Sequence, residues 1–170
     1  MTNYICINGK KAELTEEQMK ALGIEVPKAN PFERQPKTKP FYFITNKGKV
    51  EYGVEIKDFH CQGLYDAANY CTDKAILEQR SLHEILNRLL WRYSMEHKRD
   101  THEKSEAGQD VFYSIAHYAT DLFNDRDRFC VNAQCRGFGL EVYFDAKEIA
   151  EAAIKEIVEP FMKAHPEFKF

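Results

Sequence analysis

The sequence lacks the features that would assign it to a membrane or secreted class. It contains no apolar run of the about 18 residues that a transmembrane helix needs. Its N-terminal residues hold no apolar stretch typical of a signal peptide. The five cysteines are an odd number and form no Cys-x-x-Cys pair, which argues against a secreted disulfide framework. We therefore expect a cytoplasmic protein with reduced thiols and no membrane partner.

A strong excess of either charge is also missing. Charged residues make up 30% of the 170 residues, but the formal net charge is only -3. A dedicated nucleic-acid-binding domain is usually strongly basic, and a protein that imitates the charge of DNA needs a large acidic excess. The 44% of hydrophobic residues are enough for a core that needs neither metal nor disulfides.

Known catalytic and cofactor-binding motifs are absent as well. The Gly-Phe-Gly run at 137–139 precedes a predicted strand, whereas phosphate-binding loops precede a helix. His60 and Cys61 are adjacent, and neighbours in a strand point to opposite faces, so they do not suit a base and its nucleophile. Cys130 and Cys135 lack the second pair of a zinc site. The sequence predicts no cofactor, no metal and no enzyme activity.

One acidic run keeps an enzymatic alternative open. Asp121, Asp125 and Asp127 interleave with two arginines, and grouped carboxylates can hold Mg²⁺ for phosphoryl chemistry. The same run, placed between two predicted strands, is also typical of a polar turn.

The first 40 residues predict an appendage and a linker. In residues 1–26, Asn8-Gly9 between two β-prone runs indicates a hairpin, and a capping box of Thr15 and Gln18 predicts a short helix. Residues 27–40 contain four of the six prolines, which exclude a regular helix or an interior strand. We interpret this segment as an extended linker anchored by Phe32.

Residues 41–170 are expected to form the main domain. Its first part contains a hairpin, a short strand at 68–71 and a long helix capped by Thr72 or Asp73. A solvated, mobile loop is expected at 97–110. Further strands follow, and then a last helix capped by Asp145, in which Pro160 should kink or loosen the final turn. An apolar stripe on the long helix, facing the core, consists of Leu82, Ile85, Leu86, Leu89, Leu90 and Tyr93.

The main domain shows a possible internal repeat of residues 41–97 in residues 111–165. The run Phe-Tyr-Phe-Ile at 41–44 resembles Phe-Tyr-Ser-Ile at 112–115, and Asn-Tyr-Cys-Thr at 69–72 resembles Val-Tyr-Phe-Asp at 142–145. Each pair occupies the same place in its unit. We expect an α+β fold in which an antiparallel sheet has helices packed on one face, built from two similar ββ(β)α units.

The long helix also carries the predicted partner-binding residues Arg88, Trp91, Arg92 and Tyr93. Tryptophan, tyrosine and arginine are the residues that most often anchor protein interfaces. Basic residues on this helix could meet a phosphate backbone instead, although glutamates alternate with them, as on an ordinary solvated helix face.

The order of these segments resembles small uncharacterised proteins of phages and prophages of Firmicutes. The likeness is carried by the Ile-Asn-Gly-Lys hairpin at 7–10, Leu-Thr-Glu-Glu-Gln at 14–18, Asn-Pro-Phe-Glu-Arg at 30–34 and Glu-Pro-Phe-Met at 159–162. Residues 97–128 depart from the pattern and look like an insertion. The motifs mark a lineage and supply no functional residue.

Short phage proteins of this kind include inhibitors of bacterial defence, among them anti-CRISPR proteins. The resemblance therefore implies an inhibitor that acts in the bacterial host cell by binding a Cas nuclease or its guide-RNA complex, as a monomer or homodimer. Two alternatives stay open: a nucleic-acid-binding phage regulatory protein and a metal-dependent phosphoryl-transfer enzyme.

Overall fold

The computed structural model describes residues 4–7, 10–23, 30–118, 128–135 and 142–169. The strands are β1 (Tyr4–Ile7), β2 (Lys10–Glu13), β3 (Pro40–Ile44), β4 (Val50–Val54), β5 (Phe112–Tyr118) and β6 (Arg128–Gln134). The helices are α1 (Glu16–Ala21), α2 (Phe59–Asp66), α3 (Lys74–Glu96), α4 (Lys147–Ala153), the π-helix η1 (Ile154–Val158) and α5 (Glu159–Ala164). The fold is of the α+β class, as the sequence predicts.

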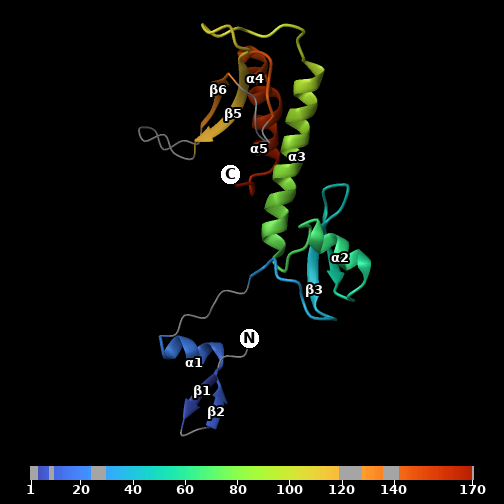
Figure 1. The fold of residues 1–170 in the computed structure, drawn as a ribbon, viewed down its shortest axis with the longest axis vertical. Coiled ribbons are helices and arrows are strands. Elements are labelled where there is room, and N and C mark those ends of the chain that lie inside the picture. The colour runs from blue at the N-terminus through green and yellow to red at the C-terminus, as the bar shows by residue number, and fades with distance from the viewer. Residues whose placement is uncertain (1–3, 8–9, 24–29, 119–127, 136–141, 170) are drawn as a thin grey trace.

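Helix α3 is the axis of the molecule. Its 23 residues extend for about 35 Å at the usual rise of an α-helix. The predicted cap at Asp73 is confirmed, because its carboxylate accepts a hydrogen bond from Ala75 N at 2.9 Å. The hairpin β3–β4 and helix α2 lie beside the lower half of α3, and α4, α5 and the hairpin β5–β6 lie on the opposite side of its upper half (Figure 1).

The two halves of α3 therefore bury different faces. Near its start, Leu77 and Ser81 are buried, and Ser81 Oγ donates a hydrogen bond to the carbonyl oxygen of Gly48 in the β3–β4 turn. Further along, Leu86, Leu90 and Tyr93 are buried on the other face. The helix thus contributes one side to each of two separate groups of elements.

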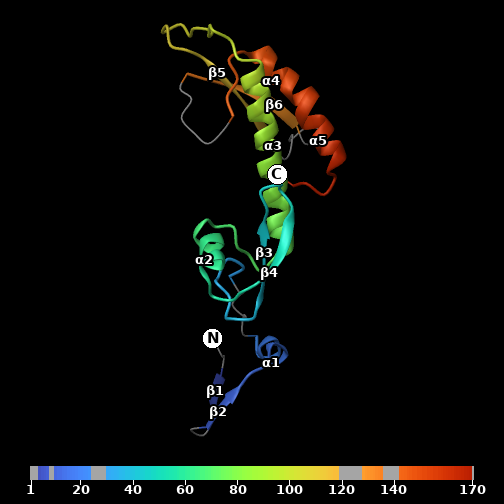
Figure 2. The same cartoon turned by 90° about the vertical axis from the view of Figure 1, so that its right-hand side faces the viewer.

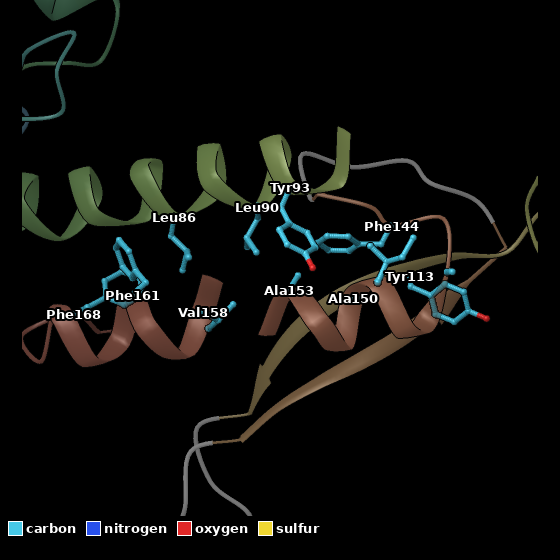
Figure 3. Close-up of a cluster of buried hydrophobic side chains, with 12 residues drawn as sticks. Leu86, Leu90, Tyr93, Tyr113, Phe144, Ala150, Ala153, Val158, Phe161 and Phe168 are labelled. Atoms are coloured by element: carbon cyan, nitrogen blue, oxygen red, sulfur yellow. The ribbon is translucent and has the colours of Figure 1, made fainter. Parts of the chain in front are cut away.

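The larger core lies between the second half of α3 and the helices α4, η1 and α5, with β5 and β6 at one end (Figure 3). Side chains of α3 point toward those of the C-terminal helices across this layer (Figure 3). Its buried residues are Leu86, Leu90, Tyr93, Tyr113, Phe144, Ala146, Ile149, Ala150, Ala153, Val158, Phe161 and Phe168. The alanines of α4 let the helices approach closely, as close packing in a core requires.

The two predicted units have the same connectivity. In the first, Tyr42 of β3 exchanges backbone hydrogen bonds of 2.7 and 3.1 Å with Cys71, just before α3. In the second, Tyr113 of β5 exchanges bonds of 2.9 and 2.8 Å with Phe144, just before α4. Each unit is a hairpin whose first strand pairs again with the residues that lead into a helix.

The expected common sheet is the part of this prediction that needs correction. The described strands form three separate two-stranded sheets, β1–β2, β3–β4 and β5–β6. The return segments at Cys71 and Phe144 each occupy the outer edge of the first strand of their own unit. These bridges close each first strand back onto its own unit, and no described strand pairs with a strand of the other unit.

Helix α2, which the sequence does not predict, precedes the segment 68–71, for which the sequence predicts a short strand. Asp58 caps α2 by accepting a hydrogen bond from Cys61 N at 2.8 Å, and only the single bridge at Cys71 remains of the strand. The hairpin β3–β4 is covered on one face by α2 residues and on the other by the start of α3.

The last helix differs from its prediction at the N-terminal cap, whereas the loosening predicted at Pro160 is present. Asp145 does not cap it: its carboxylate accepts a hydrogen bond from Arg99 N at 2.8 Å, and Ala146 is the N-terminal boundary residue without a side-chain cap. Pro160 follows the π-helix η1, where Glu159 N bonds to the carbonyl oxygen of Ile154. The wider turn accommodates a residue that has no N–H group and would clash in a regular helix.

The loop at 97–110, expected to be mobile, is largely exposed but contains a turn. Lys104 and Asp110 form an antiparallel bridge and an ion pair with 2.5 Å between the lysine Nζ and the carboxylate. Tyr113 Oη donates a hydrogen bond to the Glu103 carboxylate, which ties the loop to β5.

The N-terminal hairpin and α1 form as predicted, although the expected turn at residues 8–9 lies outside the described residues. In the capping box, Thr15 N donates to Gln18 Oε1 at 2.9 Å, and Gln18 N donates to Thr15 Oγ1 at 3.3 Å. In both views these elements occupy the end of the molecule below the hairpin β3–β4 (Figures 1 and 2).

The described part of the proline-rich segment, residues 30–39, is attached to the main domain and is more than a linker. The Pro31 carbonyl oxygen accepts a hydrogen bond from Thr72 N at 2.8 Å, and Arg34 forms an ion pair with the buried Glu55 at 3.1 Å. Phe32, the expected anchor, is 47% exposed. Arg34 rather than Phe32 holds this segment.

Candidate protein-binding surface on helix α3

Three of the four predicted partner-binding residues lie together on an exposed face of α3. Arg88, Trp91 and Arg92 are spaced by three and four residues, which places them on one side of a helix. Trp91, the single tryptophan of the chain, is 61% exposed. A large apolar ring so accessible to water is the kind of group that binding to a partner would bury.

Tyr93 is the exception, because it belongs to the core. Its side chain is 7% exposed, its ring stacks on His97 at 4.0 Å between centroids, and its hydroxyl donates to Glu156 Oε2 at 3.2 Å. Burial, followed by the nearby Glu156 carboxylate, raises the pKa of Tyr93. A partner therefore cannot reach this ring without disturbing the packing of α3 on the C-terminal helices.

Met95 completes the face, and the sequence analysis missed it. It is 50% exposed and lies four residues after Trp91 and seven after Arg88, a spacing that would have revealed it. A flexible thioether is well suited to an adaptable binding surface. We call Arg88, Trp91, Arg92 and Met95 the Trp91 surface.

The Trp91 surface continues the helix face that the hairpin β3–β4 covers at the start of α3. Leu77 and Ser81, both buried there, are followed at helical spacing by Glu84, Arg88 and Met95. Beyond the hairpin this face has no described element packed on it, since α4, α5 and β5–β6 lie on the other side of α3 (Figure 1). The face is thus buried where the hairpin covers it and exposed where the hairpin ends.

A pocket marks the boundary between the covered and exposed parts of this face. Its volume is about 350 Å³. Its wall includes Arg88 of the Trp91 surface together with Ile44, Thr45, Asn46, Ala67, Asn69, Arg80 and Glu84. The Asn69 side chain fixes one wall by bonding to both the N–H and the carbonyl oxygen of Ile44, each at 2.7 Å. A projecting side chain of a partner could enter here while its neighbours contact Trp91.

The basic residues of this region are already paired with glutamates. Arg88 and Arg80 contact Glu84 at 3.3 and 3.0 Å, and Arg92 contacts Glu96 at 3.9 Å. Such exposed pairs add little to stability, but they offset the positive charge that a phosphate backbone would need. The charge pattern favours a protein surface over a nucleic acid as the ligand.

The residues considered for metal chemistry do not form a described site. Asp121, Asp125 and Asp127 lie outside the described residues. Among the residues that the structure does describe, no group of three or more histidine, cysteine, aspartate or glutamate side chains could hold a metal ion. Cys130 is half-buried and Cys135 exposed, and Cys130 Sγ contacts Asn132 Oδ1 at 3.6 Å.

A second, larger hollow of about 620 Å³ lies where the β3–β4 turn, α3 and the C-terminal segment meet. Val50, Leu82 and Ile85 supply apolar walls, and His165 and Glu167 also line it. None of the predicted site residues lines it.

No helix within the described ranges is both long and apolar enough to cross a membrane. Comparisons of the chain with protein-family models, with curated proteins and with solved structures found no match.

Proposed function

We propose that the chain is a binding protein whose partner docks on the Trp91 surface. The observation that carries this proposal is the exposure of Trp91 and Met95, 61% and 50%, side by side on a helix face that the fold buries elsewhere. Interfaces concentrate their free energy in a few aromatic and arginine residues near the centre. Trp91 between Arg88 and Arg92 has that composition.

The partner that we propose is a bacterial defence nuclease, in particular a Cas nuclease or its guide-RNA complex. This part of the proposal is supported by the resemblance of the sequence to phage and prophage proteins. Inhibition would result from occlusion: a bound chain covers a surface that the nuclease needs for its substrate or for a conformational step. Such an inhibitor needs no turnover.

The test is to mix the purified full chain with purified Cas nucleases loaded with guide RNA, and to measure both co-elution and cleavage of target DNA. We expect co-elution and slower cleavage with one of these complexes. Trp91→Ala should weaken binding by at least about tenfold, the typical effect of removing an interface anchor. Arg92→Glu should also weaken it.

Phe59→Ala is the matched control, because Phe59 is 93% exposed but lies at the start of α2, outside the Trp91 surface. This variant should bind like the wild type. Failure of every nuclease complex to bind would contradict the proposed partner, and an unchanged affinity of Trp91→Ala would contradict the surface. A gel-shift assay with DNA and RNA alone tests the nucleic-acid alternative, since such binding would weaken steeply with salt.

A further inference from the structure

Strand β4 presents an edge that the rest of the described chain leaves unpaired. The hydrogen bonds between residues 45 and 49 and between residues 39 and 55 fix the alternation of the hairpin. Glu51 and Gly53 therefore direct their backbone groups toward β3, and Tyr52 directs its own outward. In the described part of the chain β4 pairs with β3 alone, whereas the outer edge of β3 is taken by Cys71.

The side chains along this edge form an apolar stripe that α3 covers only in part. Val50 packs against the cluster under the start of α3. Beyond it, Tyr52 is 61% exposed, Val54 41% and Ile56 54%, all at the period of two that places residues on one face of an extended chain. The Tyr52 ring makes an edge contact with Tyr42, at 6.2 Å between centroids.

β4 lacks several of the usual protections of an exposed edge. Natural edge strands carry lysine, proline, a bulge or an inward charge that prevents pairing with another chain. β4 contains none of these: its sequence is Val-Glu-Tyr-Gly-Val, its pairing with β3 is regular, and its one charged residue, Glu51, is exposed. At the Val54 end of β4, Cys61 Sγ lies 3.8 Å from the Val54 carbonyl oxygen. This contact uses one lone pair of the oxygen, and the second lone pair can still accept a hydrogen bond.

The sequence of β4 is also complementary to itself when two copies run antiparallel. With Tyr52 at the centre, Val50 of each copy faces Val54 of the other, and Glu51 faces Gly53. The carboxylate thus meets a residue without a side chain, and directly opposed glutamates, which would repel, are avoided. Tyr52, whose outward N–H and carbonyl groups can bond to those of the second copy, lies on the symmetry axis.

We infer that the β4 edge pairs with the same edge of a second copy of this chain, giving a symmetric homodimer with a four-stranded sheet in the order β3–β4–β4–β3. Because the two-fold axis is perpendicular to the sheet, the apolar stripes of both copies lie on the same face. The uncovered Tyr52 and Val54 of one copy then lie beside Val50 and the start of α3 of the other. The inference does not depend on the proposed function, since the Trp91 surface is separate from β4.

Sedimentation of the full chain at increasing concentration tests the dimer. The weight-average mass should rise from that of one chain to that of two. Tyr52→Lys places two charges on the symmetry axis and should raise the dissociation constant by at least about tenfold. Trp91→Lys, which changes an equally exposed aromatic residue outside the edge, should dimerise like the wild type. A chain that stays monomeric up to millimolar concentration would overturn the inference, as would dimerisation that Tyr52→Lys leaves intact.

Cross-linking tests the register and does not depend on the folding of the lysine variant. In an antiparallel hydrogen-bonded pair the Cα atoms are about 5.5 Å apart, a separation that a disulfide can span. In a background with the exposed Cys135 changed to serine, Tyr52→Cys should therefore form a covalent dimer on mild oxidation. Val54→Cys should not, because its copies would be roughly 13 Å apart along the strands. Equal cross-linking of the two variants would overturn the register and with it the inferred sheet.

Discussion

At the scale of single residues, Glu55 is a buried carboxylate held by several hydrogen bonds. Its side chain is fully buried and accepts hydrogen bonds from Arg34 Nε and Nη2 at 3.1 Å each, Tyr70 Oη at 3.0 Å and Lys57 N at 2.7 Å. The Arg34 guanidinium is the main cause that lowers the pKa of Glu55 from 4.5 to about 2, against the opposing effect of burial. A buried carboxylate with this set of donors is fully satisfied.

The lowered pKa makes part of the folding stability depend on pH. Since the carboxyl binds its proton more weakly in the folded chain than in the unfolded one, it contributes stability above pH 4.5, and this contribution is lost as the pH falls from 4.5 toward about 2. We expect Glu55→Gln to lower the free energy of unfolding at neutral pH and to flatten its decline across this acid range. Urea denaturation at a series of pH values measures both effects.

Glu51→Gln provides the control, since Glu51 is an exposed carboxylate on the same hairpin. It should keep the acid dependence of the wild type. If Glu55→Gln lost stability between pH 4.5 and 2 as steeply as the wild type, the ion pair with Arg34 would not be the source of that dependence.

The sequence predicts residue roles well where the partners are close along the chain. The capping box of Thr15 and Gln18 and the cap at Asp73 both involve neighbours within three residues. The pair of Arg34 and Glu55 spans 21 residues, and no local pattern indicates it. Tyr93 is a different case, because the sequence predicts it both in the apolar stripe and on the binding surface. Its place in the stripe is the feature that indicates the core.

At the scale of elements, the change of buried face along α3 creates the candidate site. The periodicity of Leu82 to Tyr93 predicts one apolar face. The second face depends on Leu77 and Ser81, and a buried serine gives no hydrophobic signal. The exposure of Trp91 could be inferred from its position beside the stripe. The sequence does not indicate that the hairpin β3–β4 packs on the same face of α3 and ends before Trp91.

The β3–β4 turn fixes where that hairpin meets α3, and Gly48 is its critical residue. Gly48 has φ +75°, and an added Cβ would lie 3.0 Å from Ile85 Cδ1. Gly108→Ala is a matched comparison, because Gly108 has φ +74° but open space around it. We expect Gly108→Ala to cost about 1 kcal/mol of unfolding free energy and Gly48→Ala about 2–3 kcal/mol, since only the second adds a steric contact to the backbone strain. Thermal and urea denaturation measure the difference, and equal losses would show that Ile85 moves aside without cost.

At the scale of the whole molecule, the repeat in the sequence anticipated the connectivity of the two units. It could not indicate whether their strands share a sheet, because a repeat reports the likeness of the units and not which strand edges remain free. Helix α3 joins the units instead, with Leu77 in the cluster under β3–β4 and Leu86 in the larger core. A continuous helix shared by two clusters should make them unfold together.

Leu77→Ala tests this coupling. Leu77 is fully buried, and its truncation should cost about 2–5 kcal/mol. If α3 couples the clusters, the slowest-exchanging amide hydrogens of α4, which lie in the other cluster, should exchange faster by the same free energy. Unchanged protection of α4 would show instead that the two clusters open independently.

The pairing of each described strand with its neighbour along the chain also bears on how quickly the native state is reached. Three hairpins can close without waiting for distant segments, and the bridges at Cys71 and Phe144 span only about thirty residues each. Chains whose contacts are local fold faster than those that must first bring remote strands together. The hairpins β3–β4 and β5–β6 can therefore begin to form as they leave the ribosome, before α3 and α4, which pack on them respectively, have been synthesised.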